Sequence, residues 1–218
     1  KAIRRQRQMC IRDSPKYVMS IYTRRGDSGT TQLATGERTS KSAPHIIYYG
    51  MLDELSSQLG WLIAQVEGDV LPPKVVDQLT KERELLIQAQ RLLFNLGVEG
   101  TDKALLQQYP APSNADVAAL EHQIDTISKA IGGLFRGFVL PGGHTVAAAA
   151  HVVRTVCRRT ERELISLVTR YPDENWRISE GETMAYVNRL SDFLFALARK
   201  LNYLTQHDEK SAHEMLRV

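Results

Sequence analysis

Residues 114–131 read NADVAALEHQIDTISKAI, and this stretch decides the fold class. Its apolar positions are Val117, Leu120, Ile124, Ile127 and Ile131. They are separated by three, four, three and four positions, a spacing that places them on one face of a helix. Asn114 suits the N-cap, and Gly132-Gly133 ends the segment. The stretch therefore predicts an amphipathic helix that packs against other helices.

Four other segments show helical spacing, so most of the chain is expected to be helical. They lie at about 46–66, 75–96, 144–170 and 181–204. Pro72-Pro73 and Pro141–Gly143 punctuate the chain, and residues 98–113, rich in Gly, Pro, Asp and Gln, indicate a loop. Only Val18–Tyr22 suggests a strand. Long helices with short connections favour an all-α antiparallel bundle over a parallel sheet.

Composition excludes several classes of protein. Hydrophobic residues make up 43% and charged residues 24% of the 218 positions, which is ordinary for a globular chain and argues against disorder. No stretch approaches the roughly 18 apolar residues of a membrane span. Cys10 and Cys157 are too few for a disulfide scaffold or a four-cysteine zinc site. A reducing compartment is the expectation.

The net charge of +3 conceals an asymmetry. Residues 1–25 hold eight basic residues against Asp13 alone, a charge of +7 that leaves −4 for the rest. No broad nucleic-acid-binding face is expected. The basic head is interpreted as a solvated tail, with the remnant of an organellar presequence as the alternative. The predicted organisation is a basic extension over 1–19, a helical-bundle domain over 20–205 and a C-terminal tail over 206–218.

The first candidate site is the polar stretch 22–32, YTRRGDSGTTQ, followed by 36–41, GERTSK. Glycines let backbone amides converge on a ligand, and Asp27 could hold magnesium beside phosphates. Hydroxyls come from Ser28, Thr30 and Thr31, and positive charges from Arg24, Arg25, Arg38 and Lys41. The combination suits a polyphosphate, although the P-loop spacing is absent. A polar hairpin with a flexible arm explains the same residues equally well.

The second candidate lies within the helix expected at 144–170. Arg154, Arg158 and Arg162 recur every four residues and therefore stack on one helical face. Glu161 can orient Arg158. Aligned guanidinium groups without equal compensating acids indicate an anion site. A solvated charged face is the usual alternative.

Two smaller candidates involve polar groups on largely apolar helices. Asn188 and Asp192 lie four residues apart and would bind either a nucleotide or a neighbouring helix. Asp53 would pair with an arginine from another helix or subunit, unless it is an exposed acidic turn. A ferritin-like di-iron site is excluded because the chain has no Glu-x-x-His motif. Cys157 is expected to be a buried, inert thiol rather than an activated thiolate.

Six segments together resemble the PduO-type ATP:cob(I)alamin adenosyltransferases. They are 22–29 (YTRRGDSG), 36–38 (GER), 53–57 (DELSS), 138–143 (FVLPGG), 157–162 (CRRTER) and 188–199 (NRLSDFLFALAR). Each segment alone is weak, but all six follow the family's order and span about residues 20–203. The resemblance implies a five-helix bundle that forms a homotrimer with active sites between subunits.

The resemblance also implies an activity. The 5′-deoxyadenosyl group of ATP is transferred to Co(I) of a corrinoid, giving adenosylcobalamin and triphosphate. The implied partners are ATP, magnesium and reduced corrinoid, together with a corrinoid reductase and a cobalamin-dependent enzyme, but neither nucleic acid nor membrane. The implied location is intracellular, in bacterial cytoplasm or a mitochondrial matrix. The competing hypothesis is a non-catalytic helical module that binds nucleotide or polyphosphate and regulates a partner.

The family's functional positions fall on identifiable residues of this chain. ATP and its magnesium would be held by Thr23, Arg24, Arg25, Gly26, Asp27, Ser28, Gly29, Thr30, Thr31 and Lys41, and by Arg158, Glu161, Arg162 and Asn188. Arg154 would meet Asp53 of a neighbouring subunit. Phe138 would press on the lower face of the corrinoid, and Asp192 would lie near it. The protein is assigned no metal ligand of its own, since magnesium binds through the ATP phosphates. Arg25 departs from the family, which often has a small residue there.

Overall fold

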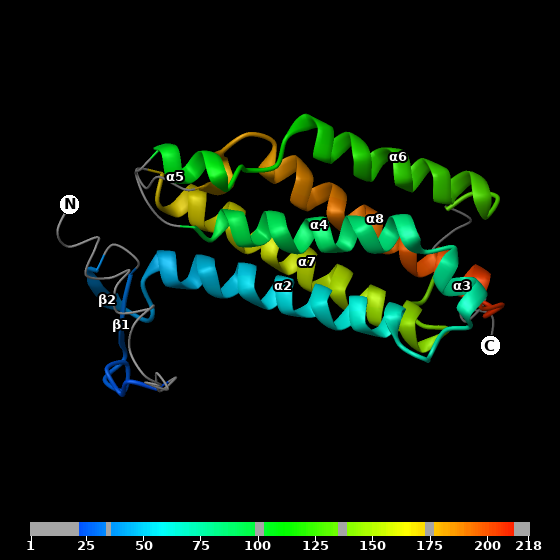
Figure 1. Ribbon diagram of the computed structural model, residues 1–218, viewed down its shortest axis with the longest axis horizontal. Coiled ribbons are helices and arrows are strands. Elements are labelled where there is room, and N and C mark those ends of the chain that lie inside the picture. Colours follow the sequence, from blue (N-terminus) through cyan, green and yellow to red (C-terminus); the bar gives the residue numbers. More distant parts are fainter. Residues whose placement is uncertain (1–21, 34–35, 99–102, 135–138, 173–176, 212–218) are drawn as a thin grey trace, which may run out of the picture. The chain divides into compact units, whose positions relative to one another are not determined.

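The computed structural model describes residues 22–33, 36–98, 103–134, 139–172 and 177–211. They form two compact units, one ending at Lys41 and one beginning at Ser42. Figure 1 shows both units.

The N-terminal unit contains a short antiparallel pair of strands. β1 (Thr30–Gln32) pairs with β2 (Arg38–Ser40), with Thr31 opposite Thr39. A hairpin, one of the two alternatives that the sequence left open for this polar stretch, is therefore present. Of the strand suggested at Val18–Tyr22, only Tyr22 is among the described residues, and it lies in no strand.

The second unit is a helical bundle, as the sequence predicts. Its elements are α2 (Pro44–Glu67), α3 (Pro73–Asp77), α4 (Thr80–Leu96), α5 (Lys103–Gln108), α6 (Asn114–Ala130), α7 (Thr145–Arg170), the 3₁₀ turn η1 (Arg177–Ser179) and α8 (Thr183–Leu204). The five long helices are α2, α4, α6, α7 and α8. α7 packs on α2 and α8, α4 packs on α2, and α6 packs on α8 (Figure 1). None of the described helices is long and apolar enough to cross a membrane.

Local structure departs from the sequence expectations at three places. The helix expected at 75–96 is divided into α3 and α4, because the chain turns at Gln78, whose N–H bonds back to Val75 and Val76. The loop expected at 98–113 contains the short helix α5. Ser113, not Asn114, is the N-cap of α6, because its hydroxyl and the Asp116 carboxylate form a reciprocal capping box.

Polar bridges tie the helices together inside the apolar core. Glu82 of α4 is only 1% exposed. Its Oε1 accepts hydrogen bonds from Gln123 of α6 and from Lys200 of α8, each at 2.7 Å. A buried carboxylate needs such partners, so this contact fixes the packing of three helices.

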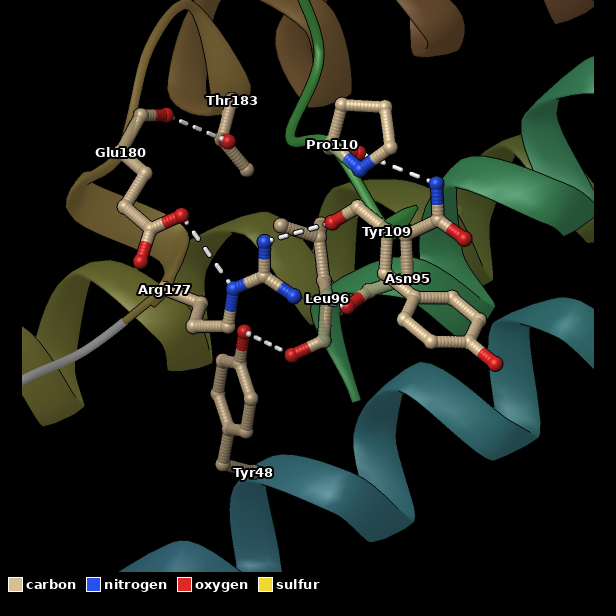
Figure 2. A network of polar contacts seen from close by, with 8 residues as sticks. All are labelled: Tyr48, Asn95, Leu96, Tyr109, Pro110, Arg177, Glu180 and Thr183. Atoms are coloured by element: carbon tan, nitrogen blue, oxygen red, sulfur yellow. Dashed lines mark hydrogen bonds and ion pairs between the residues drawn. The ribbon is translucent and has the colours of Figure 1, made fainter. Parts of the chain in front are cut away.

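A second network fixes the opposite end of the bundle, where the loops after α4 and α7 meet (Figure 2). The buried Arg177 guanidinium donates to the carbonyl of Asn95 and, at 2.7 Å, to the carbonyl of Tyr109. Its Nε lies 3.2 Å from the Glu180 carboxylate. The Asn95 side chain in turn donates to the carbonyl of Pro110 at 3.0 Å. One buried cation thus joins the carbonyl of Asn95 at the end of α4 to that of Tyr109 in the following loop.

Candidate active site

The arginine-bearing helix α7 begins in the core and becomes more exposed along its arginine face. His144 is its N-cap, and the His144 ring accepts a hydrogen bond from Val146 N at 3.3 Å. Small apolar residues bury the first turns, and Val153 and Val156 remain buried beside the arginines. Arg154 is half-buried, whereas Arg158 and Arg162 are exposed. The small residues allow α7 to pack closely on its neighbours, which brings the Arg154 side chain to the edge of the core.

Arg154 and Arg158 line a pocket of about 190 Å³ between α6, α7 and α8. Asp192, predicted from the sequence, lines the same pocket. Ser191 and Phe195, from the same segment as Asp192, also line the pocket, and Ile124 and Leu134, which were given no role from the sequence, complete it. The structure therefore joins the second and third candidate regions in one place. The i, i+4 spacing of Asn188 and Asp192 indicated the part that α8 plays in this site. It gave no indication that α6 contributes to the pocket.

The charges in this pocket are unevenly compensated. Burial, and then the neighbouring charge of Arg158, lowers the pKa of Arg154. Arg154 Nε is buried and has no hydrogen-bond partner within the described part of the chain. Asp192 pairs instead with Arg189 at 2.8 Å. The pocket thus presents two guanidinium groups that form no ion pair among the described residues, an arrangement that favours an anionic ligand.

Glu161 and Asn188 meet on the surface between α7 and α8. Asn188 Nδ2 donates a hydrogen bond to Glu161 Oε1 at 2.8 Å. Glu161 therefore takes Asn188 as its partner, where the sequence suggested that it orients Arg158. Two side chains assigned to the nucleotide site by resemblance are adjacent, one turn of α7 from Arg158.

Asp53 lies apart from the arginine pocket in this chain. It is exposed on α2 and lines a separate apolar hollow of about 190 Å³ formed with α4. Asp53 forms no ion pair among the described residues. The ion pair that does join α2 to α7 is formed by Glu54 and Arg159, which sequence spacing alone could not identify because 105 positions separate the two residues.

The N-terminal arm builds a tight cationic turn. Arg24 and Gly29 have left-handed φ angles of 59° and 81°. Arg38 donates to the Thr30 hydroxyl and, at 2.8 Å, to the carbonyl of Arg25. The Lys41 ammonium lies 3.3 Å from the point where a Cβ on Gly26 would sit. Glycine at position 26 therefore leaves room for the ammonium group beside the turn.

The remaining arm residues are placed around this turn. Thr23, Arg25, Asp27 and Ser28 are exposed, and Thr31 is half-buried on β1. The Arg24 guanidinium lies 5.7 Å from the centre of the Tyr22 ring. The arm thus gathers hydroxyls, the two carboxylates of Asp27 and Glu37, and several cations. Phe138 lies outside the described residues.

Two titratable groups near the arginines, the Cys157 thiol and the His151 ring, are held in their neutral forms. Burial raises the pKa of the Cys157 thiol, which donates to the carbonyl of Val187 at 3.4 Å. The prediction of an inert thiol is therefore supported. Burial, followed by the charges of Arg154 and Arg199, lowers the pKa of His151 to about 4. No cluster of three histidine, cysteine or acidic residues suited to a metal ion occurs among the described residues.

Comparison with known proteins places the chain in a family. The family model for cobalamin adenosyltransferase matches residues 21–201. The chain therefore belongs to the cobalamin adenosyltransferase family, as the sequence resemblance predicted.

Its relatives carry consistent descriptions. The corrinoid adenosyltransferase PduO of Citrobacter freundii is 39% identical over 187 residues, which cover 83% of this chain and 49% of that protein. This chain thus spans about half the length of the PduO relatives it matches. A cobalamin adenosyltransferase of Cupriavidus metallidurans is 38% identical over 185 residues, covering 85% of this chain and 89% of that protein.

Solved structures agree with the fold. A variant of the PduO-type ATP:corrinoid adenosyltransferase from Lactobacillus reuteri, complexed with cobalamin and ATP, superposes with a TM-score of 0.71 at 30% identity. The match covers 88% of this chain and 96% of that one. A second variant of the same enzyme, complexed with ATP, gives a TM-score of 0.69 at 31% identity, with coverage of 88% and 99%.

Proposed function

We propose that this chain transfers the 5′-deoxyadenosyl group of ATP to Co(I) of a corrinoid, giving an adenosylated corrinoid and triphosphate. The observation that carries the proposal is the pocket lined by Arg154 and Arg158, in a chain whose family members are named for this reaction. The relative from Lactobacillus reuteri supports both substrates, since its structure was solved with cobalamin and ATP.

The chemistry requires no nucleophile from the protein. The electron pair of Co(I) attacks C5′ of ATP, a Co–C5′ bond forms, and the C5′–O bond breaks. Cobalt becomes Co(III), and triphosphate leaves with the electron pair of the broken bond. The inert Cys157 thiol is compatible with this scheme. What the protein must supply is substrate positioning and stabilisation of the charge on the leaving group, a role suited to Arg158.

The nucleotide would be held by two surfaces. The N-terminal arm supplies backbone amides at its tight turn, hydroxyl groups and the Lys41 ammonium. Arg158, Arg162 and the Glu161–Asn188 pair supply the second surface. Magnesium fits the arm's donor set, because it binds through one or two carboxylates together with phosphates and water. Asp27 is an exposed carboxylate within the turn itself, and the ion would neutralise phosphate charge.

The active form is proposed to be a homotrimer in which Arg154 meets Asp53 of a neighbouring subunit. Asp53 forms no ion pair within the described chain, and Arg154 Nε has no partner there. Beside Asp53, Phe94 is 65% exposed at the apolar hollow of α2 and α4. An exposed aromatic ring next to an apolar hollow is typical of an interface.

The corrinoid would bind between Phe138 and the nucleotide. The aromatic ring would exclude a lower cobalt ligand, which eases reduction, and Asp192 would lie beside the corrinoid. A corrinoid reductase and a cobalamin-dependent enzyme would supply the substrate and use the product, inside the cell.

The test is a visible spectrum recorded after the protein is mixed with magnesium, ATP and cob(I)alamin. ATP-dependent conversion of the Co(I) spectrum to that of an alkylated Co(III) corrinoid supports the proposal. ATP binding without this conversion would instead support a regulatory nucleotide-binding module.

A further inference from the structure

Two buried polar residues near the end of α8 contact the segment that joins α6 to α7, residues 131–144, called here the α6–α7 connection. Arg199 is 7% exposed and Asn202 is 1% exposed, and they lie three residues apart. Both belong to the described residues, and neither was given a role from the sequence. Polar side chains this deeply buried are retained only with specific partners, so their partners are informative.

These partners flank the α6–α7 connection on both sides. Arg199 Nη1 donates to the carbonyl of Leu134, four residues beyond the end of α6 at Ala130. Asn202 Oδ1 accepts from His144 N at 2.9 Å, and Asn202 Nδ2 donates to the carbonyl of Gly142 at 3.0 Å. The two side chains thus hold the chain both before and after residues 135–138.

A third segment locks both residues in place. Glu209, which follows α8, forms an ion pair with Arg199 and accepts a hydrogen bond from Asn202 at 3.3 Å. The same segment bonds to the connection through its backbone, because Leu140 N donates to the carbonyl of Lys210 at 2.9 Å. The end of α8 and the segment that contains Glu209 and Lys210 therefore bind the α6–α7 connection together, and they are called its support below.

The fit at Gly143 shows how closely this support is built. Gly143 has a φ of 93°, and a Cβ there would lie 2.2 Å from Asn202 Oδ1. Only glycine allows the backbone to approach the amide this closely. The Pro141–Gly143 turn and Asn202 are therefore matched to each other.

The support also reaches the arginine pocket. Leu134, whose carbonyl Arg199 binds, lines that pocket, and so does Phe195. The Arg199 guanidinium carbon lies 5.8 Å from the centre of the Phe195 ring. Movement of Arg199 would therefore disturb two walls of the pocket as well as the connection.

We infer that Arg199 and Asn202 are positioning residues for the corrinoid side of the site, acting through the α6–α7 connection and locked by Glu209. The inference rests on the proposed function, which assigns Phe138 of that connection to the corrinoid. None of these contacts involves the N-terminal arm. The Asn202 contacts, with His144, Gly142 and Glu209, also involve no residue that lines the arginine pocket. Loss of the Asn202 contacts should therefore weaken corrinoid binding and leave ATP binding intact.

The test compares Asn202→Ala with Asn95→Ala, a matched change of a buried asparagine at the opposite end of the bundle. For each variant the KM for cobalamin, the KM for ATP, the midpoint of thermal unfolding and the spectrum of bound cob(II)alamin in saturating ATP are measured. Asn202→Ala should raise the KM for cobalamin about tenfold, as expected for a lost buried hydrogen bond. It should also increase the five-coordinate fraction of cob(II)alamin, with an unchanged KM for ATP. Asn95→Ala should lower only the thermal midpoint.

The inference is overturned if Asn202→Ala behaves like Asn95→Ala, or if both KM values rise together. Glu209→Gln, which keeps the shape of the side chain and removes its charge, decides the matter if Asn202→Ala does not fold. It should shift the cobalt spectrum in the same direction by a smaller amount, and an unchanged spectrum refutes the inference. A wild-type protein that forms no Co–C product in this assay would fail the proposed function itself, which separates the two results.

Discussion

Arg154 and Arg158 lie one helical turn apart on α7 and line the same pocket. Burial, and next the charge of Arg158, lowers the pKa of Arg154, so the two guanidinium groups repel each other in a partly desolvated place. Asp192 is the carboxylate of that pocket, and it pairs with Arg189. Such a repulsion is relieved when an anion arrives, which is why the pocket is assigned to triphosphate and to a subunit contact.

Arg158→Ala should abolish turnover while the bundle stays folded. The exposed arginine contributes little to stability, but a charge-assisted contact to the leaving triphosphate in a closed site contributes several kcal/mol to the transition state. Steady-state kinetics and circular dichroism measure the two effects. Arg170→Ala, an exposed arginine at the end of α7, is the matched control and should remain active. Near-normal turnover of Arg158→Ala would remove Arg158 from the site.

Asp53 and Arg154 should be energetically coupled between subunits. Truncation of one partner strands the other charge, at a cost of roughly 3–5 kcal/mol where the pair is buried. A double-mutant cycle with Asp53→Asn and Arg154→Gln, read out by trimer dissociation, measures this coupling.

The control cycle uses Glu54→Gln and Arg159→Gln on the same two helices. That pair is about half exposed and should couple by only about 0–1 kcal/mol. Equal coupling in the two cycles would argue against the intersubunit pair.

Sequence periodicity predicted the bundle because each long helix carries its own apolar stripe. In α6, for example, Leu120 and Ile127 are fully buried, as the spacing indicated. The break at Gln78 and the short helix α5 escaped prediction. Each involves only a short stretch of chain, which is too short to show a repeating pattern of apolar residues.

The candidate site was only partly predictable, for a related reason. The spacing of Arg154 and Arg158 and the position of Asp192 lie within single helices and were readable. The contributions of Phe195 and Leu134, and the anchors Arg199 and Asn202, depend on how α6, α7 and α8 meet. Contacts between residues 58 or more positions apart, such as that of Asn202 with His144 or Gly142, leave no pattern in a single sequence.

His151 should make the protein less stable in mild acid. It is 4% exposed, and its ring nitrogens have no partners among the described residues. Its pKa falls from 6.5 to about 4 on folding, chiefly through burial. As the pH falls, His151 is therefore protonated at a higher pH in the unfolded chain than in the folded protein. Stability is fully present above pH 6.5 and declines as the pH falls toward 4, by roughly 3 kcal/mol in total.

Urea unfolding across this pH range tests the His151 prediction. His151→Leu cannot take up the proton and sacrifices no hydrogen bond, so its stability should depend less on pH than that of the wild type. Parallel pH profiles for the two proteins would show that His151 does not control acid stability.

Phe138→Ala should separate the two substrates. Loss of the ring admits a lower ligand, so bound cob(II)alamin becomes more five-coordinate and harder to reduce, whereas the affinity for ATP changes little. Electron paramagnetic resonance in saturating ATP measures the coordination. Leu140→Ala, at an exposed position two residues on, is the control. An identical mixture of four- and five-coordinate cobalt in wild type and Phe138→Ala would show that Phe138 does not exclude a lower cobalt ligand.

The most direct test of the central claim follows the transferred carbon. Wild-type protein is mixed with cob(I)alamin, magnesium and ATP labelled with carbon-13 at C5′, and the products are examined by NMR and by phosphate chromatography. The account predicts labelled carbon bonded to cobalt, with one equivalent of intact triphosphate for each equivalent of adenosylcobalamin. Label that stays in ATP, or that appears in ADP or AMP with release of phosphate or pyrophosphate, would contradict it.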